Sequence, residues 1–179
     1  MNKPCHTDYS LEQHSQFLNS MATDLNENFM RRAIALATEN VRTNAGGPFG
    51  AVIVKNGEIV GEGVNTVTAT NDATAHAEVN AIRNACHNLK TFDLSDCELY
   101  TSCEPCPMCW AASYWARIKT IYYGNRAEDA DRINFADYFL YQQLAKPRAH
   151  RVIPEHELLR EEAWESFQAW ADSTTKVEY

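Results

Sequence analysis

The fold class is indicated first by a hairpin pattern in residues 51–64, AVIVKNGEIVGEGV. The dipeptide Asn56-Gly57 separates two runs of strand-forming residues, and Asn-Gly is the strongest short-range signal for a tight hairpin turn. We therefore predict two neighbouring antiparallel strands, at residues 51–55 and 58–64.

Helical and strand patterns alternate on both sides of this hairpin. Before it, apolar residues recur at three- and four-residue spacing over residues 27–43, and Asn26 can cap that helix. The elements predicted after it are a helix at 74–86, a strand at 98–102, a helix at 105–117, a strand at 118–123, a helix at 137–145, a strand at 151–153 and a helix at 158–171. This alternation predicts an α/β fold, a three-layer α-β-α sandwich around a five-stranded mixed sheet.

The length and composition are those of one soluble domain. The chain has 179 residues, of which 45% are hydrophobic and 22% charged, and a domain holds roughly 150 residues. Residues 1–24 form a polar extension without an apolar signal core, so we expect residues 25–179 to be the functional domain and the protein to be cytoplasmic. No apolar run approaches the roughly 20 residues of a membrane helix.

The charge balance bears on the partners. The net charge is −8, from 16 basic and 24 acidic residues. Proteins that bind nucleic acids or anionic membranes usually gather basic side chains at the binding surface. We therefore expect neither nucleic acid nor membrane as a partner, and a small neutral or cationic substrate fits better.

Two short motifs carry the chemistry, and each opens a predicted helix. They are His76-Ala77-Glu78 and Pro105-Cys106-Pro107-Met108-Cys109. The imidazole of His76 and the thiolates of Cys106 and Cys109 supply three ligands for zinc and leave a fourth position for water, as in catalytic zinc sites. The positive ends of the two helices help to keep the cysteines as thiolates.

Glu78 is the candidate proton carrier. It lies two residues after His76, so it can stand beside a zinc-bound water without being a ligand. Zinc lowers the pKa of such a water to about 7, and a carboxylate within reach can pass its proton to the substrate. The two motifs together, in this order, are the signature of zinc nucleobase deaminases.

Other interpretations of the cysteines remain open at this point. Cys106 and Cys109 alone could form a redox motif, which would leave His76 and Glu78 without a role. A closed structural zinc site could use Cys103 as its fourth ligand, although Cys103 fits better as a small residue at a strand end. The non-enzymatic alternative is an interaction module whose fold is stabilised by a bound zinc ion.

Several neighbouring residues have simpler interpretations. Helical spacing favours core positions for Trp110 and Trp115, and we expect Phe49 in the core as well. Glu104 is expected to order its loop through hydrogen bonds rather than to take part in the chemistry.

The sequence resembles the cytidine deaminase-like superfamily and, within it, the small bacterial zinc-dependent guanine deaminases. The resemblance runs from about residue 29 to the C-terminus, which leaves the N-terminal extension outside it. It is carried by residues 46–52, 71–78, 100–109, 114–117 and 167–170 and by the final Glu178-Tyr179.

The resemblance implies a set of roles for individual residues. His76, Cys106 and Cys109 match the ligands of one zinc ion per subunit, and Glu78 matches the proton shuttle. The residues that match contacts to the purine base or the leaving amine are Asn65, the main-chain amide of Ala77, Asp137 (which also assists proton movement) and Tyr179. The implied reaction is the hydrolysis of guanine to xanthine and ammonia.

The resemblance also implies a homodimer that exchanges its C-terminal segments, residues 155–179, so that Tyr179 closes the neighbour's pocket. Guanosine, cytosine or an aminotriazine are alternative substrates. Adenosine in transfer RNA fits less well, because residues 155–179 hold seven acidic and two basic residues. This local charge of −5 would repel a phosphate backbone.

Overall fold

The Asn56-Gly57 turn forms as predicted and joins the first two strands of a mixed sheet. The computed structural model describes the backbone of residues 11–178 and side chains from residue 26 onward. Strand β1 (Gly50–Lys55) pairs antiparallel with β2 (Glu58–Val64). Asn56 and Gly57 have φ angles of 51° and 80°, the left-handed conformations that a tight hairpin turn requires at both central positions.

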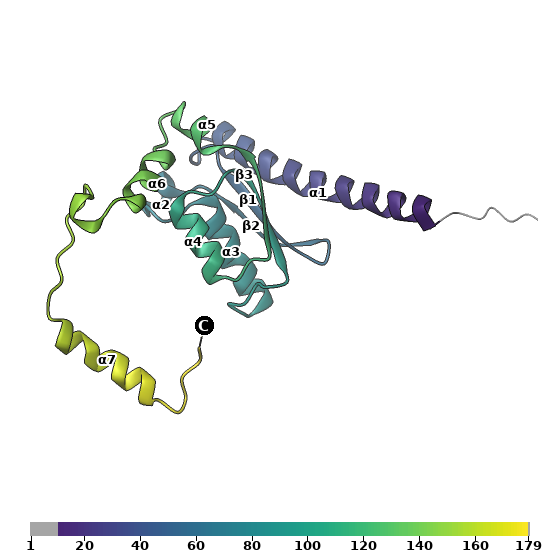
Figure 1. The fold of residues 1–179 in the computed structure, drawn as a ribbon. Coiled ribbons are helices and arrows are strands. Elements are labelled where there is room, and N and C mark those ends of the chain that lie inside the picture. The colour runs from purple at the N-terminus through teal and green to yellow at the C-terminus, as the bar shows by residue number, and fades with distance from the viewer. Residues whose placement is uncertain (1–10, 179) are drawn as a thin grey trace, which may run out of the picture.

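The described sheet lies among the helices (Figure 1), and its four strands have the order β2-β1-β3-β4. Strand β3 (Cys97–Cys103) runs antiparallel to β1, and β4 (Thr120–Asn125) runs parallel to β3. A parallel neighbour needs a crossover connection, and helix α4 (Pro107–Trp115) supplies it.

Helices cover both faces of the sheet. Helix α1 (Leu11–Arg42) packs against β1 and β3 on one face, and α3 (Ala77–Leu89) packs against β2 and β1 on the other, with α4 beside it. The remaining helices are α2 (Val67–Thr70), α5 (Ala127–Asp131), α6 (Asp137–Ala145), the 3-10 turn η1 (Arg148–His150) and α7 (Arg160–Asp172). The α/β class is therefore confirmed.

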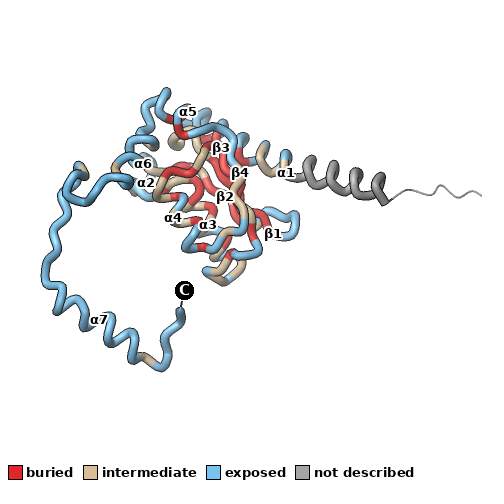
Figure 2. The backbone as a smooth tube through the Cα atoms, in the orientation of Figure 1, coloured by how far each residue is buried: buried red, intermediate tan, exposed pale blue. Residues whose placement is uncertain are grey.

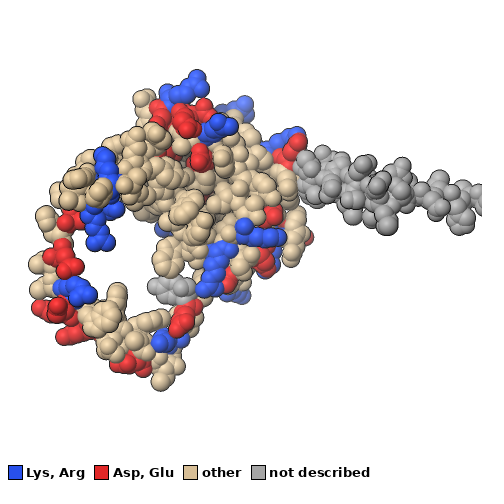
Figure 3. All heavy atoms as spheres, in the orientation of Figure 1, with Lys and Arg blue, Asp and Glu red and all other residues tan. Residues whose placement is uncertain are grey.

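The alternation of β1 side chains divides the core between the two faces. Val52 and Val54 lie with Tyr100 on the α1 side, whereas Ala51 and Ile53 belong to the cluster on the α3 side. This burial is concentrated in the sheet, while the C-terminal part of the chain, including α7, is exposed and stands apart from it (Figure 2). Acidic side chains lie along that outer segment (Figure 3).

Three asparagines attach α3 to β2. They are spaced four residues apart along the helix, and each donates its side-chain amide to a main-chain carbonyl of β2. With each step of four residues along α3, the accepting carbonyl lies two residues earlier in β2. The bonds join Asn80 to Val64 (2.9 Å), Asn84 to Glu62 (2.8 Å) and Asn88 to Val60 (2.9 Å). This asparagine ladder fixes the register of the helix that carries the His76 motif.

Glycine at position 63 is required by the close approach of α3 to β2. A Cβ there would lie 2.2 Å from Ala77 O and 2.4 Å from Ala81 N. Gly63→Ala is therefore expected to lower the free energy of unfolding by about 2 kcal/mol, a typical cost of overpacking. Urea unfolding measures this loss.

The control for Gly63→Ala is Gly47→Ala, in which the added Cβ meets only side-chain atoms, the nearest at 3.3 Å. A loss of stability as large in the control as in Gly63→Ala would contradict the close-packing argument.

The fifth strand predicted at Arg151–Ile153 is wrong within the described part of the chain. These residues form bends, and Val152 and Ile153 are 66% and 78% exposed. Strand-forming side chains make a strand only where a neighbouring strand accepts their backbone hydrogen bonds, and the chain has left the sheet at this point.

The boundaries of several helices also differ from prediction, and α4 spans Pro107–Trp115 rather than 105–117. Helix α1 begins at Leu11 rather than near residue 27. Asn26 does not cap the start of a helix, because its side-chain Oδ1 accepts a hydrogen bond from the Tyr100 hydroxyl (2.8 Å) instead. Helix α3 begins three residues later than predicted, because Asp72 and Thr74 form a turn before it. Among the described residues, no helix is long and apolar enough to cross a membrane.

Candidate active site

The N-terminal ends of α3 and α4 bring the two motifs together. His76 and Cys106 are the residues immediately before these helices, both with extended backbone, and Cys109 lies in the first turn of α4. Pro107 occupies the first turn of α4, where a missing amide hydrogen leaves no hydrogen bond unmade. The local sequence therefore starts each helix at the point where its ligands are needed.

The three predicted metal ligands form a compact triangle. His76 Nδ1 lies 3.6 Å from Cys106 Sγ and 3.5 Å from Cys109 Sγ, and the two sulfurs are 3.6 Å apart. Zinc bonds of about 2.3 Å to sulfur and about 2.05 Å to nitrogen, at tetrahedral angles, give edges of roughly 3.8 Å between sulfurs and roughly 3.5 Å between sulfur and nitrogen. The donor set thus fits one zinc ion. No other cluster of three or more potential ligands occurs among the described residues.

Cys103 does not complete the site. It ends β3, as predicted, and its thiol donates to the carbonyl of Arg126 (Sγ to O 3.7 Å). The closed four-ligand alternative therefore finds no support in the described residues. The three-ligand arrangement leaves one tetrahedral position open, as catalytic zinc sites do.

The electrostatics of the three groups suit a bound cation. The hydrogen bond with Cys109, together with the neighbouring His76, lowers the pKa of the Cys106 thiol, and the same hydrogen bond, followed by burial, raises the pKa of Cys109. The hydrogen bond with Cys106 raises the pKa of His76. The cluster therefore stabilises a thiolate together with a positive charge next to it.

Glu78 is buried beside this cluster without belonging to it. Its side chain is 4% exposed. Oε2 accepts from the thiol of Cys109 at 3.4 Å, and Oε1 accepts from the hydroxyl of Thr101 at 3.2 Å. Burial is the main cause that raises the pKa of this carboxyl. The carboxyl is thus held next to the ligands by two donors from separate elements.

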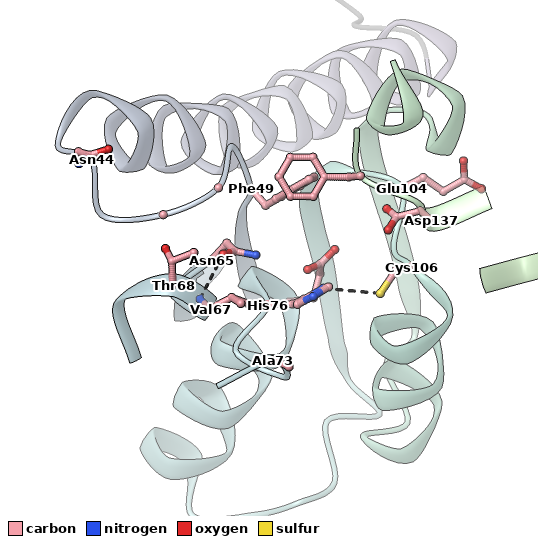
Figure 4. Close-up of a pocket in the computed structure, with 14 residues that line it drawn as sticks. Asn44, Phe49, Asn65, Val67, Thr68, Ala73, His76, Glu104, Cys106 and Asp137 are labelled. Atoms are coloured by element: carbon pink, nitrogen blue, oxygen red, sulfur yellow. Dashed lines mark hydrogen bonds between the residues drawn. The ribbon is translucent and has the colours of Figure 1, made fainter. Parts of the chain in front are cut away.

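A cavity of about 420 Å³ opens onto the cluster (Figure 4). This volume is in the range of small-molecule sites. His76, Glu78 and Cys106 lie at one end of it. The other lining residues are Asn44, Gly46, Gly47, Phe49, Asn65, Val67, Thr68, Ala73, Glu104, Phe135 and Asp137.

Asn65 follows β2, as predicted, and presents its side chain to this cavity (Figure 4). Its main-chain N–H donates to Phe49 O (3.1 Å), and its Oδ1 accepts from Val67 N (3.3 Å). The residue is 5% exposed. The carboxamide is therefore oriented by its own loop, with its NH₂ group on the cavity side.

Asp137 is the first residue of α6 and also lines the cavity. Burial, followed by the negative charge of Cys106, raises the pKa of its carboxyl. The hydroxyl of Tyr141, one turn further along α6, donates to Pro105 O at 2.7 Å. This bond attaches the helix that carries Asp137 to the loop that carries Cys106.

The two remaining predicted site residues are Ala77 and Tyr179. Ala77 is fully buried at the start of α3 and is not one of the residues that line the cavity. Tyr179 lies outside the described residues.

The structure corrects the interpretation of the neighbouring aromatic residues. Phe49 packs against the core and also lines the cavity, where its ring meets Phe135 edge to face with centroids 4.8 Å apart. Phe135 was missed, since nothing in its sequence context separates a pocket wall from a core position. Trp110 and Trp115 are 46% and 68% exposed, so their predicted core positions are wrong.

Two polar residues around the cavity hold its loops. The prediction for Glu104 is confirmed, because its Oε2 accepts from Ala127 N at 3.0 Å. Asn40 was missed: it is buried and donates its side-chain amide to Gly47 O and Asn65 O. Its only sequence signal is a polar residue on the otherwise apolar face of a helix.

The chain is similar to deaminases along most of its length. It is 52% identical over 153 residues to the guanine deaminase of Bacillus subtilis (strain 168), covering 86% of this chain and 98% of that protein. The crystal structure of the Bacillus subtilis guanine deaminase superposes with a TM-score of 0.83.

Two further relatives are more distant. A mutant of the protein NE0047 solved in complex with 8-azaguanine is 33% identical, covers 63% of this chain and 64% of that chain, and has a TM-score of 0.60. A tRNA-specific adenosine deaminase of Aquifex aeolicus (strain VF5) is 49% identical over 74 residues, which are 41% of this chain and 49% of that protein.

The similarity is centred on the metal ligands. Residues 23–125 match the family model described as the cytidine and deoxycytidylate deaminase zinc-binding region, and this range contains the whole triangle of His76, Cys106 and Cys109. The chain belongs to the cytidine and deoxycytidylate deaminase zinc-binding family.

Proposed function

We propose that this protein hydrolyses guanine to xanthine and ammonia. The observation that carries the proposal is the zinc-ligand triangle beside the buried carboxyl of Glu78, at one end of the cavity. The similarity to the Bacillus subtilis guanine deaminase over 86% of the chain supports guanine as the substrate. His76, Cys106 and Cys109 would hold the zinc ion, which would lower the pKa of a water molecule and so make the nucleophile available.

Glu78 moves the proton that hydrolysis requires. A C–O bond forms at the purine carbon that bears the amino group, and Glu78 takes the proton of the attacking water and delivers it to the adjacent ring nitrogen. The hydroxyl of Thr101 holds the carboxyl in position. The remaining hydroxyl proton then passes through Glu78 or Asp137 to the amine, the C–N bond breaks and ammonia leaves, and the C–OH group becomes the carbonyl of xanthine.

The remaining cavity residues bind and orient the base. The side-chain amide of Asn65 and the main-chain amide of Ala77 donate hydrogen bonds to it. Phe49 and Phe135 supply apolar walls that exclude water, and Tyr179 closes the pocket. Asp137 stands at the same end as Cys106, where the amine departs.

The C-terminal segment, residues 155–179, packs on a second copy of the chain in this proposal and brings Tyr179 to the neighbour's pocket. Three large aromatic side chains of α7 support this, since Trp164, Phe167 and Trp170 are 57%, 67% and 47% exposed. Apolar surface gathered in this way is typical of an interface. The described part of the segment stands clear of the sheet (Figure 2).

The experiment that tests the proposed function is an ammonia-release assay of the zinc-loaded protein. Guanine is expected to react, and guanosine, cytosine, an aminotriazine and adenosine in transfer RNA are expected to react at least about 100-fold more slowly in kcat/KM, the discrimination available to a closed pocket. If any of these four compounds has a higher kcat/KM than guanine, that compound replaces guanine as the assigned substrate.

Deletion of Tyr179 tests the closing residue. The shortened chain is expected to keep its zinc and its dimeric mass but to lose about tenfold or more in kcat/KM for guanine, because the open pocket admits water. Sedimentation and zinc analysis provide the controls. A deletion without effect on kcat/KM would remove Tyr179 from the site.

A further inference from the structure

Asn40 connects three parts of the chain beneath the cavity. It lies in the last turn of α1 and is 4% exposed. Its Nδ2 donates to Gly47 O and to Asn65 O, both at 2.8 Å. Both hydrogens of this NH₂ group therefore reach main-chain carbonyls of residues that line the cavity.

The loop at Gly46 and Gly47 is built around this contact. A Cβ at Gly46 would lie 2.1 Å from Asn65 O and 3.0 Å from Asn40 Nδ2, so no larger residue fits between them. A Cβ at Gly47 would instead meet Phe49, Phe135 and the Asn65 side chain. Gly46 faces the Asn40 contact, and Gly47 faces the cavity.

The same region is closed by main-chain bonds. Ala45 N donates to Asn40 O at 3.0 Å, and Asn65 N donates to Phe49 O at 3.1 Å. The end of α1, the glycine loop and the end of β2 are thus joined at one place, and the Asn40 side chain supplies the bonds that link the helix to the other two.

We propose that Asn40 is a positioning residue for substrate binding, which holds Asn65 and Gly47 at the distance from each other that the purine base requires. This inference rests on the proposed function, in which Asn65 binds the base. His76, Glu78, Cys106 and Cys109 are held by α3, α4 and β3, whereas the Asn40 side chain donates to Gly47 O and Asn65 O. Loss of Asn40 therefore affects binding of the base more than the chemical step.

The test is a double-mutant cycle of Asn40→Ala and Asn65→Ala, with KM and kcat for guanine and the zinc content measured for each variant. Asn40→Ala is expected to raise KM about tenfold, the loss expected when a buried acceptor loses its donor, with kcat within about threefold and zinc unchanged. When Asn65 is already alanine, Asn40→Ala is expected to raise KM by less than a further factor of about two, because the effects of two residues that act as a unit do not add.

The control is Asn88→Ala. It removes a solvent-exposed bond from a helix carboxamide to the main-chain carbonyl of Val60, at the end of β2 remote from Asn65. KM of this variant is expected to stay within about twofold of the wild type. An equal rise in KM in the control, an equal factor for Asn40→Ala in both backgrounds, or an effect confined to kcat would each overturn the proposal.

A second variant and a second measurement cover poor folding of Asn40→Ala. Asn40→Asp keeps the side-chain volume but places carboxylate oxygens against two carbonyls, so the same rise in KM is expected. Hydrogen exchange of residues 44–49 should become faster in both Asn40 variants and not in Asn88→Ala, and unchanged exchange would overturn the proposal. If the wild-type protein releases no ammonia from guanine, the proposed function fails, and the exchange measurement still decides whether Asn40 holds the loop.

Discussion

Glu78→Gln is expected to lower kcat for guanine by about 10³-fold while the protein keeps its zinc. Glutamine preserves the shape of the side chain and can still accept the hydrogen bond from Thr101, but it cannot take up or release a proton at neutral pH. General acid–base catalysis contributes about 10² to 10⁴ in rate, and this carboxyl transfers the proton in the proposed reaction. Single-turnover ammonia release and metal analysis measure the two quantities.

Glu98→Gln is the matched control for that experiment. Glu98 is a half-buried carboxyl on β3 that accepts from the Tyr100 hydroxyl at 3.0 Å, and it does not line the cavity. The kcat of the Glu98→Gln variant is expected to remain within about twofold of that of the wild type. A zinc-loaded Glu78→Gln protein with nearly wild-type turnover would show that another group moves the proton.

Cys109→Ala is expected to abolish turnover and to lose most of the bound zinc. Removal of one thiolate leaves two protein ligands, fewer than the three of catalytic zinc sites. A metal that binds only the folded state stabilises it by about 4 kcal/mol at 1,000 times its Kd, which for a chain of this size is roughly 10 °C in Tm. A chelator should therefore lower the Tm of the wild type but not that of Cys109→Ala.

Cys103→Ala separates the loss of a ligand from the loss of a buried cysteine. Cys103 is as buried as Cys106, at 3% exposure, but its sulfur contacts Arg126 O rather than the ligand triangle. This variant is expected to keep its zinc, its turnover and the effect of the chelator on Tm. Loss of zinc from Cys103→Ala would mean that a fourth protein ligand takes part.

The parts of the fold that the sequence predicted correctly are those specified by local chemistry. Asn56-Gly57 forms the turn because its two residues tolerate positive φ. Proline in the first turn identified helix α4, although the helix begins at Pro107 rather than at the predicted residue 105. The strand predicted at Arg151–Ile153 fails because strand formation depends on a neighbouring strand, which local sequence does not specify.

The candidate site divides in the same way. His76, Cys106 and Cys109 were predictable because their spacing places them at two helix starts, and the structure brings their donor atoms within 3.6 Å of one another. Asn40 and Phe135 were not, because the partners that give them a role lie far along the chain or across the cavity. Trp110 shows a related limit, since helical spacing identifies an apolar face but not what covers it.

The asparagine ladder on β2 has a consequence for self-association through the sheet. Three main-chain carbonyl groups of this border strand already hold donors from α3, and an incoming polypeptide would have to displace them before it could pair. The opposite border, β4, has β3 as its only neighbour in the described sheet. Addition of a strand from another molecule therefore meets less competition at the β4 edge than at the β2 edge.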